Sequence, residues 1–170
     1  MRIVNILLFN LNWFACVIGG AAWGSMGLIA LLAYSAYVGS WRKDIRLALS
    51  LAVCGWILDS LWIYFGVLDY GSAYAPVWIV MLWVGLAFTL NHSMSPFISK
   101  PFIGGLAAAI AAPLTYLSGA ALGAVNVLST TGILLISLTW CVLFFGIFRY
   151  LQLHKEKSAS LENGKNPYAY

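Results

Sequence analysis

The chain has 170 residues, of which 62% are hydrophobic and only 8% are charged. A soluble domain carries about 25% charged residues, so this chain has too few charges to cover a water-facing surface. The composition favours a helix bundle whose outer surface is solvated by lipid. The net charge of +4 comes from a few scattered Lys and Arg residues, which argues against nucleic-acid binding.

Six apolar stretches follow one another, and each is long enough to cross a hydrocarbon core of about 30 Å as a helix. Helices are expected because lipid cannot satisfy unpaired backbone groups, and because the sequence does not alternate like a barrel strand. Pro113 lies in the fifth stretch and leaves open whether that helix is continuous or kinked. The predicted spans are residues 3–19, 21–39, 46–66, 76–94, 101–118 and 124–149.

The basic residues predict how these helices are oriented. If the N-terminus is cytoplasmic, all nine Lys and Arg residues fall at that terminus, around the second and fourth connections or in the tail. The connections on the other side carry Asp69 as their only charge. The positive-inside rule then predicts that both termini are cytoplasmic. Residues 1–151 are expected to form the bundle. Residues 152–170, which are polar and without periodicity, are expected to form a disordered cytoplasmic tail.

Asp59 is the one carboxylate clearly inside a predicted span, in the outer half of the bilayer. A charged side chain costs a few kcal/mol in a membrane, so it needs a partner or a function. At 1.5 Å per residue it lies about 20 Å from the cytoplasmic end of its helix. Trp56 and Trp62, three residues before and after it, are predicted to share its face. Two interpretations stay open: Asp59 binds a proton, a cation or a ligand head group, or it fastens two helices together.

Depth along the helices selects the partners of Asp59. Trp83 and either Thr115 or Tyr116 are predicted at a similar depth, and Asn12 somewhat deeper, which gives a polar and aromatic pocket open toward the non-cytoplasmic side. His92 lies near the cytoplasmic end of the fourth span. Its depth differs from that of Asp59 by more than about 10 Å, so a direct pair of the two is not expected. His92 is a candidate proton site or an interfacial side chain that meets water and head groups.

Small and polar residues predict where helices approach one another. Asn10 and the neighbouring candidate Asn12 point about 200° apart around a helix, so both cannot face one partner. The pairs Gly20-xxx-Gly24 and Gly119-xxx-Gly123 allow close approach of backbones. They predict tight packing within the bundle or a homodimer formed through these faces.

Motifs of common catalytic and metal sites are absent from the sequence, which has no HExxH, GxSxG, Walker lysine or CxxC pattern. Cys16, Cys54 and Cys141 lie inside apolar runs, where thiols act as small apolar side chains. We therefore expect no metal and no cofactor, and the sequence favours a non-enzymatic role.

Three sequence runs carry a resemblance to a known family. They are Trp56-Ile57-Leu58-Asp59-Ser60-Leu61-Trp62, the run from Pro76-Val77-Trp78 through Leu82-Trp83 to residues 88–93, and residues 112–124. They resemble a family of bacterial multi-pass inner-membrane proteins known as domain of unknown function 2878. At Ala112 the family prefers glycine. The resemblance implies a bacterial inner-membrane location and genes near those of lipid-modifying enzymes, but no activity and no site residues.

Together these observations predict an all-α polytopic membrane protein of about six helices. Its expected role is to bind or move a lipid or small amphiphile, with membrane lipids as partners. The alternatives are a proton-coupled small-solute transporter and a membrane-embedded lipid-modifying enzyme or its accessory subunit. The candidate ligand-binding residues are Asp59, Trp56, Trp62, Trp83, Tyr116 and Asn12, with His92 as a candidate proton site.

Overall fold

The computed structural model describes residues 2–163. The described part of the chain is helical apart from two strands of two residues each, which confirms the all-α part of the predicted fold class. Four helices are long and apolar enough to cross a membrane, and α3, with 14 residues, is a shorter apolar helix. The elements are α1 (Arg2–Tyr37), α2 (Trp41–Tyr64), β1 (Leu68–Asp69), α3 (Val77–Leu90), the 3-10 helix η1 (Ser95–Ser99), α4 (Pro101–Ala121), β2 (Asn126–Val127) and α5 (Thr130–Asn163).

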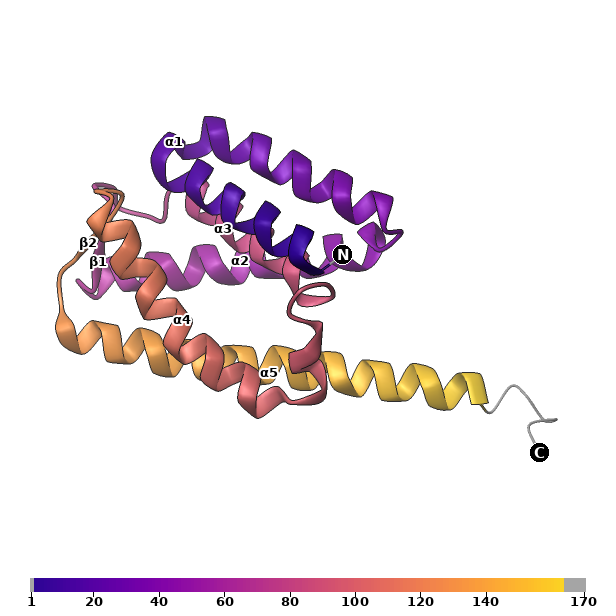
Figure 1. Ribbon diagram of the computed structural model, residues 1–170. Helices are drawn as coiled ribbons and strands as arrows, with labels where there is room; N and C mark the ends of the chain where they lie inside the picture. The colour runs from indigo at the N-terminus through magenta and orange to yellow at the C-terminus, as the bar shows by residue number, and fades with distance from the viewer. Residues whose placement is uncertain (1, 164–170) are drawn as a thin grey trace.

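Helix α1 is a helical hairpin that reverses its direction at Gly20 (Figure 1). Gly20 has φ 60° and ψ −148°, a conformation open to glycine because it has no Cβ. The two halves touch closely: a Cβ on Gly27 would lie 2.5 Å from Oδ1 of Asn12, and one on Gly24 would lie 2.6 Å from Sγ of Cys16. The chain therefore turns where the sequence predicts the boundary between its first two spans.

The helices form two layers, which Figure 1 shows one above the other. In the first layer, α1 and α2 both pack on α3, and in the second layer α4 packs on α5. The 3-10 helix η1 connects the layers at one end. At the other end β1 pairs with β2 in an antiparallel ladder, with Leu68 opposite Val127. The two layers are thus joined at both ends, and the space between them is bounded by long helices.

A row of aromatic rings crosses from one layer to the other. Trp83 of α3 stacks on Trp140 of α5 with 4.7 Å between ring centroids, and Trp140 stacks on Phe144 at 5.1 Å. Phe144 and Phe148 meet edge to face at 5.9 Å. The three α5 rings are four residues apart and so lie on one helix face. This row attaches the second layer to the centre of the first.

Several helix boundaries differ from the prediction. Helix α3 ends at Leu90, four residues earlier than expected, and α5 begins at Thr130, six residues later. Helix α4 is continuous through Pro113. The expected disorder of the tail is wrong for residues 152–163, which continue α5 as a helix, whereas residues 164–170 lie outside the described chain. Leu, Gln, Lys, Glu and Ala favour helices, and extending an existing helix needs no new nucleation.

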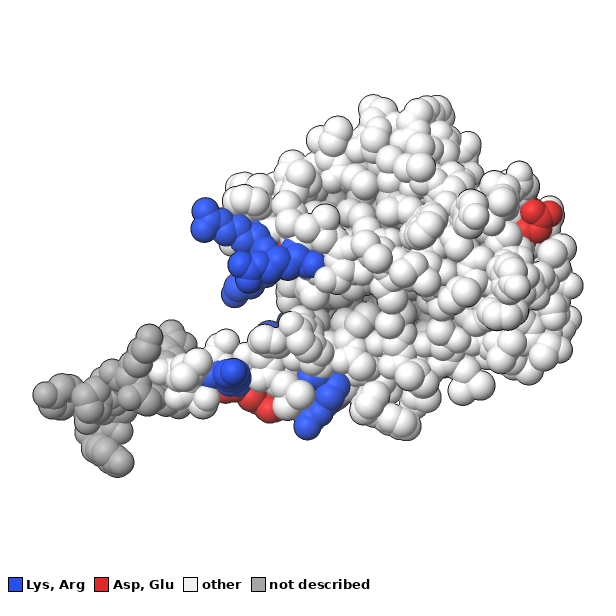
Figure 2. Space-filling view, turned by 180° about the vertical axis from the view of Figure 1, so that it is seen from behind, with Lys and Arg blue, Asp and Glu red and all other residues white. Residues whose placement is uncertain are grey.

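The basic side chains gather toward one end of the molecule (Figure 2). Figure 2 shows the basic side chains toward one end of the molecule and an acidic side chain at the other. Asp69 lies in β1, at the end opposite to the starts of α2 and α4 (Figure 1). The basic residues therefore share one end of the molecule in space (Figure 2), while the orientation of that end in a membrane stays a prediction. The described Lys and Arg residues are Arg2, Arg42, Lys43, Arg46, Lys100, Arg149, Lys155 and Lys157.

Candidate functional site

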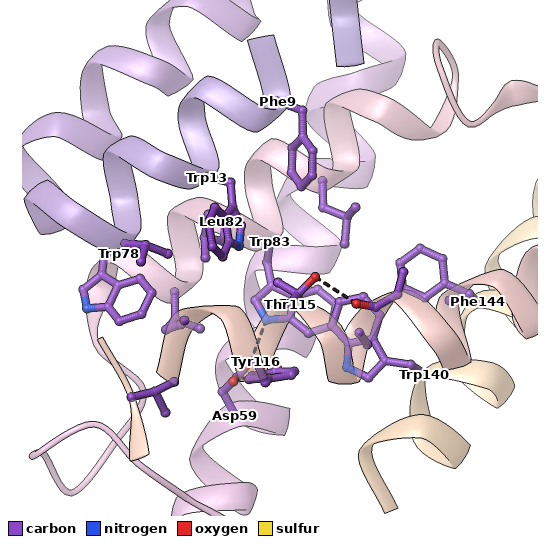
Figure 3. A pocket seen from close by; sticks show the side chains of 18 of the residues that line it. Phe9, Trp13, Asp59, Trp78, Leu82, Trp83, Thr115, Tyr116, Trp140 and Phe144 are labelled. Carbon is purple, nitrogen blue, oxygen red and sulfur yellow. Dashed lines mark hydrogen bonds between the residues drawn. The ribbon is translucent and has the colours of Figure 1, made fainter. Parts of the chain in front are cut away.

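A cavity of about 180 Å³ lies between the two layers. One wall is a stripe of α1 side chains, Phe9, Trp13 and Val17, which are four residues apart and share a helix face. The opposite wall is a stripe of small side chains within residues 108–119 of α4. Figure 3 shows Phe9 and Trp13 on the opposite side of the cavity from Thr115. Side chains of α3 and α5 form the floor.

The cavity opens sideways, along α4. Ala111 and Thr115 line the cavity and are exposed on the surface of the described chain. Both lie in the middle of α4, which is one of the helices long and apolar enough to cross a membrane. If α4 crosses a membrane, these two residues lie at the depth of the acyl chains. The lining is almost entirely apolar or aromatic.

Asp59 lies at one end of this cavity and is fully buried. The indole Nε1 of Trp83 donates a hydrogen bond to its Oδ2 at 2.7 Å. The hydroxyls of Tyr70 and Tyr116 donate to its Oδ1, each at 2.9 Å. These three donors come from α3, α4 and the connection after β1, so the carboxylate joins four segments of the chain. Such bonds are what makes a buried carboxylate tolerable away from water.

Two of the predicted neighbours, Trp83 and Tyr116, therefore contact Asp59. Neither Trp56 nor Trp62 lines the cavity or donates to Asp59. Trp56 is exposed and stacks on Tyr74 with 6.1 Å between centroids. Trp62 is buried in the core, and its indole N–H has no partner in the described chain. Residues three before and three after a given residue point about 60° to either side of it, so the pair diverges around the helix.

Asn12 is fully buried but does not line the cavity. Its side chain packs against Gly27 of the hairpin and Gly85 of α3, and its Nδ2 has no hydrogen-bond partner in the described chain. Asn10 is exposed and donates to the carbonyl oxygen of Ile6 at 2.8 Å. The two asparagines therefore face different surroundings, as predicted, and Asn12 belongs to the contact between α1 and α3.

Sequence reasoning missed Tyr70, which completes the hydrogen bonds of Asp59. Tyr70 follows β1 in the connection between α2 and α3, where no periodicity indicates which way a side chain points. The connection reaches the cavity because Val67 and Leu68 of this segment are buried against the second layer. An aromatic residue in a turn carries no signal by which the sequence alone could have assigned it to the site.

His92 is remote from Asp59, as the depth argument predicts, and pairs with Asp44 instead. The distance between His92 Nε2 and Asp44 Oδ2 is 2.7 Å. Asp44 is fully buried and also accepts hydrogen bonds from Ser35, from Ser40 at 2.7 Å and from Asn91 at 3.0 Å. Sequence reasoning missed Asp44 because it follows two basic residues and was assigned to a connection.

The Asp44 cluster contains a serine, a histidine and an aspartate but is not a catalytic triad. Ser40 Oγ lies 3.0 Å from His92 Nε2, the same ring nitrogen that contacts Asp44. In a triad the aspartate binds Nδ1 and leaves Nε2 for the serine. Within residues 2–163, no three or more His, Cys, Asp or Glu side chains are grouped so that they could hold a metal ion.

Comparison with known proteins identifies the family of this chain. The family model described as "Protein of unknown function (DUF2878)" matches residues 2–145. No curated protein and no solved structure gives a significant match. The matched region contains α1 to α4 and the cavity-lining part of α5, and so includes both buried aspartates. The chain therefore belongs to the DUF2878 family, in agreement with the resemblance carried by its three sequence runs.

Proposed function

We propose that this protein binds or moves a lipid or small amphiphile, whose apolar part occupies the cavity between the two layers. The observation that carries the proposal is the sideways opening at Ala111 and Thr115, in the middle of an apolar helix. A ligand dissolved in the bilayer reaches such an opening without passing through water. Small-molecule sites are typically apolar with a few placed polar groups, and this cavity has that composition.

The size of the cavity limits what it holds. A dry apolar cavity of about 150 Å³ accommodates benzene, so about 180 Å³ accommodates one ring or a short length of acyl chain. The wall from Phe9 to Val17 extends about 12 Å along the helix, which is long enough for a chain to lie against it. The remainder of a larger ligand would lie in the opening beside α4.

The surroundings of Asp59 favour this proposal over the two alternatives. A transporter of small polar solutes needs a polar path, whereas this cavity is lined almost entirely by apolar and aromatic side chains. An enzyme of acid–base type needs a second acid or base beside the carboxylate. The groups that contact Asp59 are two phenols and an indole, which act here as hydrogen-bond donors.

The proposal includes six membrane crossings with both ends in the cytoplasm of a bacterium. It is supported by the reversal of α1 at Gly20 and by the grouping of basic residues at one end of the molecule. Two reporters are fused after Tyr170, one that is active only in the cytoplasm and one that is active only in the periplasm. We expect activity from the cytoplasmic reporter alone. Activity of a periplasmic reporter at this position would contradict the orientation.

Native mass spectrometry of the full chain in mild detergent tests ligand binding. We expect a co-purified lipid or amphiphile that is lost from Ala111→Trp, because the indole fills the opening. Leu114→Trp is the matched control, because Leu114 is exposed on the same helix and does not line the cavity. A wild-type chain without ligand, or equal ligand on the two variants, would overturn the proposal.

A further inference from the structure

A second groove lies on another part of the surface, between the second half of α1 and α2. It has a volume of about 300 Å³ and is lined by apolar side chains only. On the α2 wall the small residues Ala48 and Ala52 alternate with the larger Ile45 and Leu49. Helices α1 and α2 pack mainly on α3 and touch each other little, which leaves this space open. We call it the α1–α2 groove.

The Asp44 cluster joins the two walls of the groove at one end. Ser35, near the end of α1, donates a hydrogen bond to Asp44, in the first turn of α2. The carboxylate is fully buried, contacts His92 and does not line the groove. The joined end is the end that carries the exposed basic residues of α2.

Two exposed arginines of α2 lie beside the groove wall. Arg42 is three residues before Ile45, and Arg46 is three residues before Leu49, so both are helix-surface neighbours of the lining side chains. Arg42 and Arg46 are four residues apart, which places their Cβ atoms about 6 Å from each other. Trp41 is 43% exposed, and the Arg42 guanidinium lies 5.4 Å from the centre of its ring. Exposed tryptophans of this kind mark the depth of lipid head groups.

A groove open to the bilayer is filled by lipid, because its apolar walls hold no water. We propose that the α1–α2 groove binds an acyl chain of an anionic phospholipid, and that Arg42 and Arg46 bind its phosphate. Guanidinium groups match phosphate oxygens in paired hydrogen bonds, and basic sites at the cytoplasmic side attract anionic head groups. The inference rests on residues that do not line the cavity near Asp59, and so does not depend on the function proposed above.

Lipid competition on the purified full chain tests this inference. The protein is incubated with equal amounts of phosphatidylglycerol and phosphatidylethanolamine of identical chains, and the bound lipids are counted by native mass spectrometry. The wild-type chain is expected to prefer phosphatidylglycerol, and Arg42→Gln with Arg46→Gln is expected to reduce that preference about tenfold. Equal binding of the two lipids to the wild-type chain would overturn the inference.

Two comparisons separate a specific site from diffuse charge. Arg46→Gln and Lys43→Gln each remove one charge from the same helix end, but Lys43 points about 120° or more around the helix from every lining residue of α2, whereas Arg46 is about 60° from Leu49. Only Arg46→Gln is expected to lower the preference, and an equal effect of Lys43→Gln would contradict a site. Ala52→Trp fills the groove and is expected to release the bound phospholipid. A variant that still binds this lipid would also contradict the proposal. The arginine variants change exposed side chains, so the test holds even if Ala52→Trp fails to fold.

The cavity variant distinguishes this lipid from the ligand of the proposed function. Ala111→Trp closes the cavity on α4, far along the chain from the α1–α2 groove. We expect it to leave the preference for phosphatidylglycerol unchanged. Loss of both bound molecules in that one variant would show that the groove is not a separate site.

Discussion

Helix α2 carries two fully buried aspartates, and their surroundings differ at every contact. Asp44 and Asp59 are 15 residues apart, which is about 22 Å along the helix. Asp59 accepts hydrogen bonds from neutral aromatic donors and borders a cavity. Asp44 pairs with a histidine and accepts bonds from hydroxyl and amide groups. The same side chain is therefore buried by two different chemistries, one toward each end of α2.

The difference also lies in what each aspartate holds together. Asp44 joins the turn between α1 and α2 to the end of α3, which are parts of one layer. Asp59 receives donors from both layers, because Trp83 belongs to α3 and Tyr116 to α4. Loss of Asp59 is therefore expected to weaken the packing of the two layers on each other. Loss of Asp44 is expected to loosen one end of a single layer.

The largest expected effect is that of Asp59→Asn. The amide group cannot accept from all three donors, and its own N–H groups would face the Trp83 indole N–H. We expect the free energy of unfolding to fall by about 2–4 kcal/mol, measured by unfolding in mixed detergent micelles. Ligand binding in the cavity should fall as well. Unchanged stability together with unchanged ligand binding would eliminate Asp59 as a site residue.

Asp44→Asn is expected to have a smaller and more local effect. It removes the partner of His92 but keeps an oxygen that accepts from Ser40 or Asn91, so we expect a loss of about 1–2 kcal/mol. Hydrogen exchange should rise around residues 34–44 and 89–94 and stay unchanged in α4. His92→Gln is the companion variant and should raise exchange in the same segments. Faster exchange in α4 would show that the two aspartates do not act on separate parts of the fold.

The smallest effect is predicted for Tyr70→Phe, which removes one of the two donors to Oδ1 of Asp59. Tyr116 keeps that oxygen hydrogen-bonded, so the expected loss is about 1 kcal/mol or less in the same unfolding measurement. The control is Trp56→Phe, an exposed position on the same helix as Asp59, for which no measurable change is expected. An equal loss in both variants would remove Tyr70 from the site.

Much of this architecture could be predicted from the sequence, because lipid restricts the backbone to helices and helices advance by a constant rise. Composition indicated the membrane class, and the boundary between the first two predicted spans lay at the turn within α1. Counting residues from the helix ends placed Trp83 and Tyr116 at the depth of Asp59 and separated it from His92. These conclusions concern position along a helix axis, which depends on local sequence.

The tertiary structure decided which way each side chain faces and which distant segments meet. Trp56, Trp62 and Asn12 lie near the predicted depth, but packing on neighbouring helices turns them away from the cavity. Tyr70 reaches Asp59 from a connection without periodicity, and Asp44 meets His92 across 48 residues of chain. Rotation around a helix axis and the course of a connection depend on contacts between segments. Local sequence therefore determined the depth of the site, and only the packing of the two layers determined which residues form it.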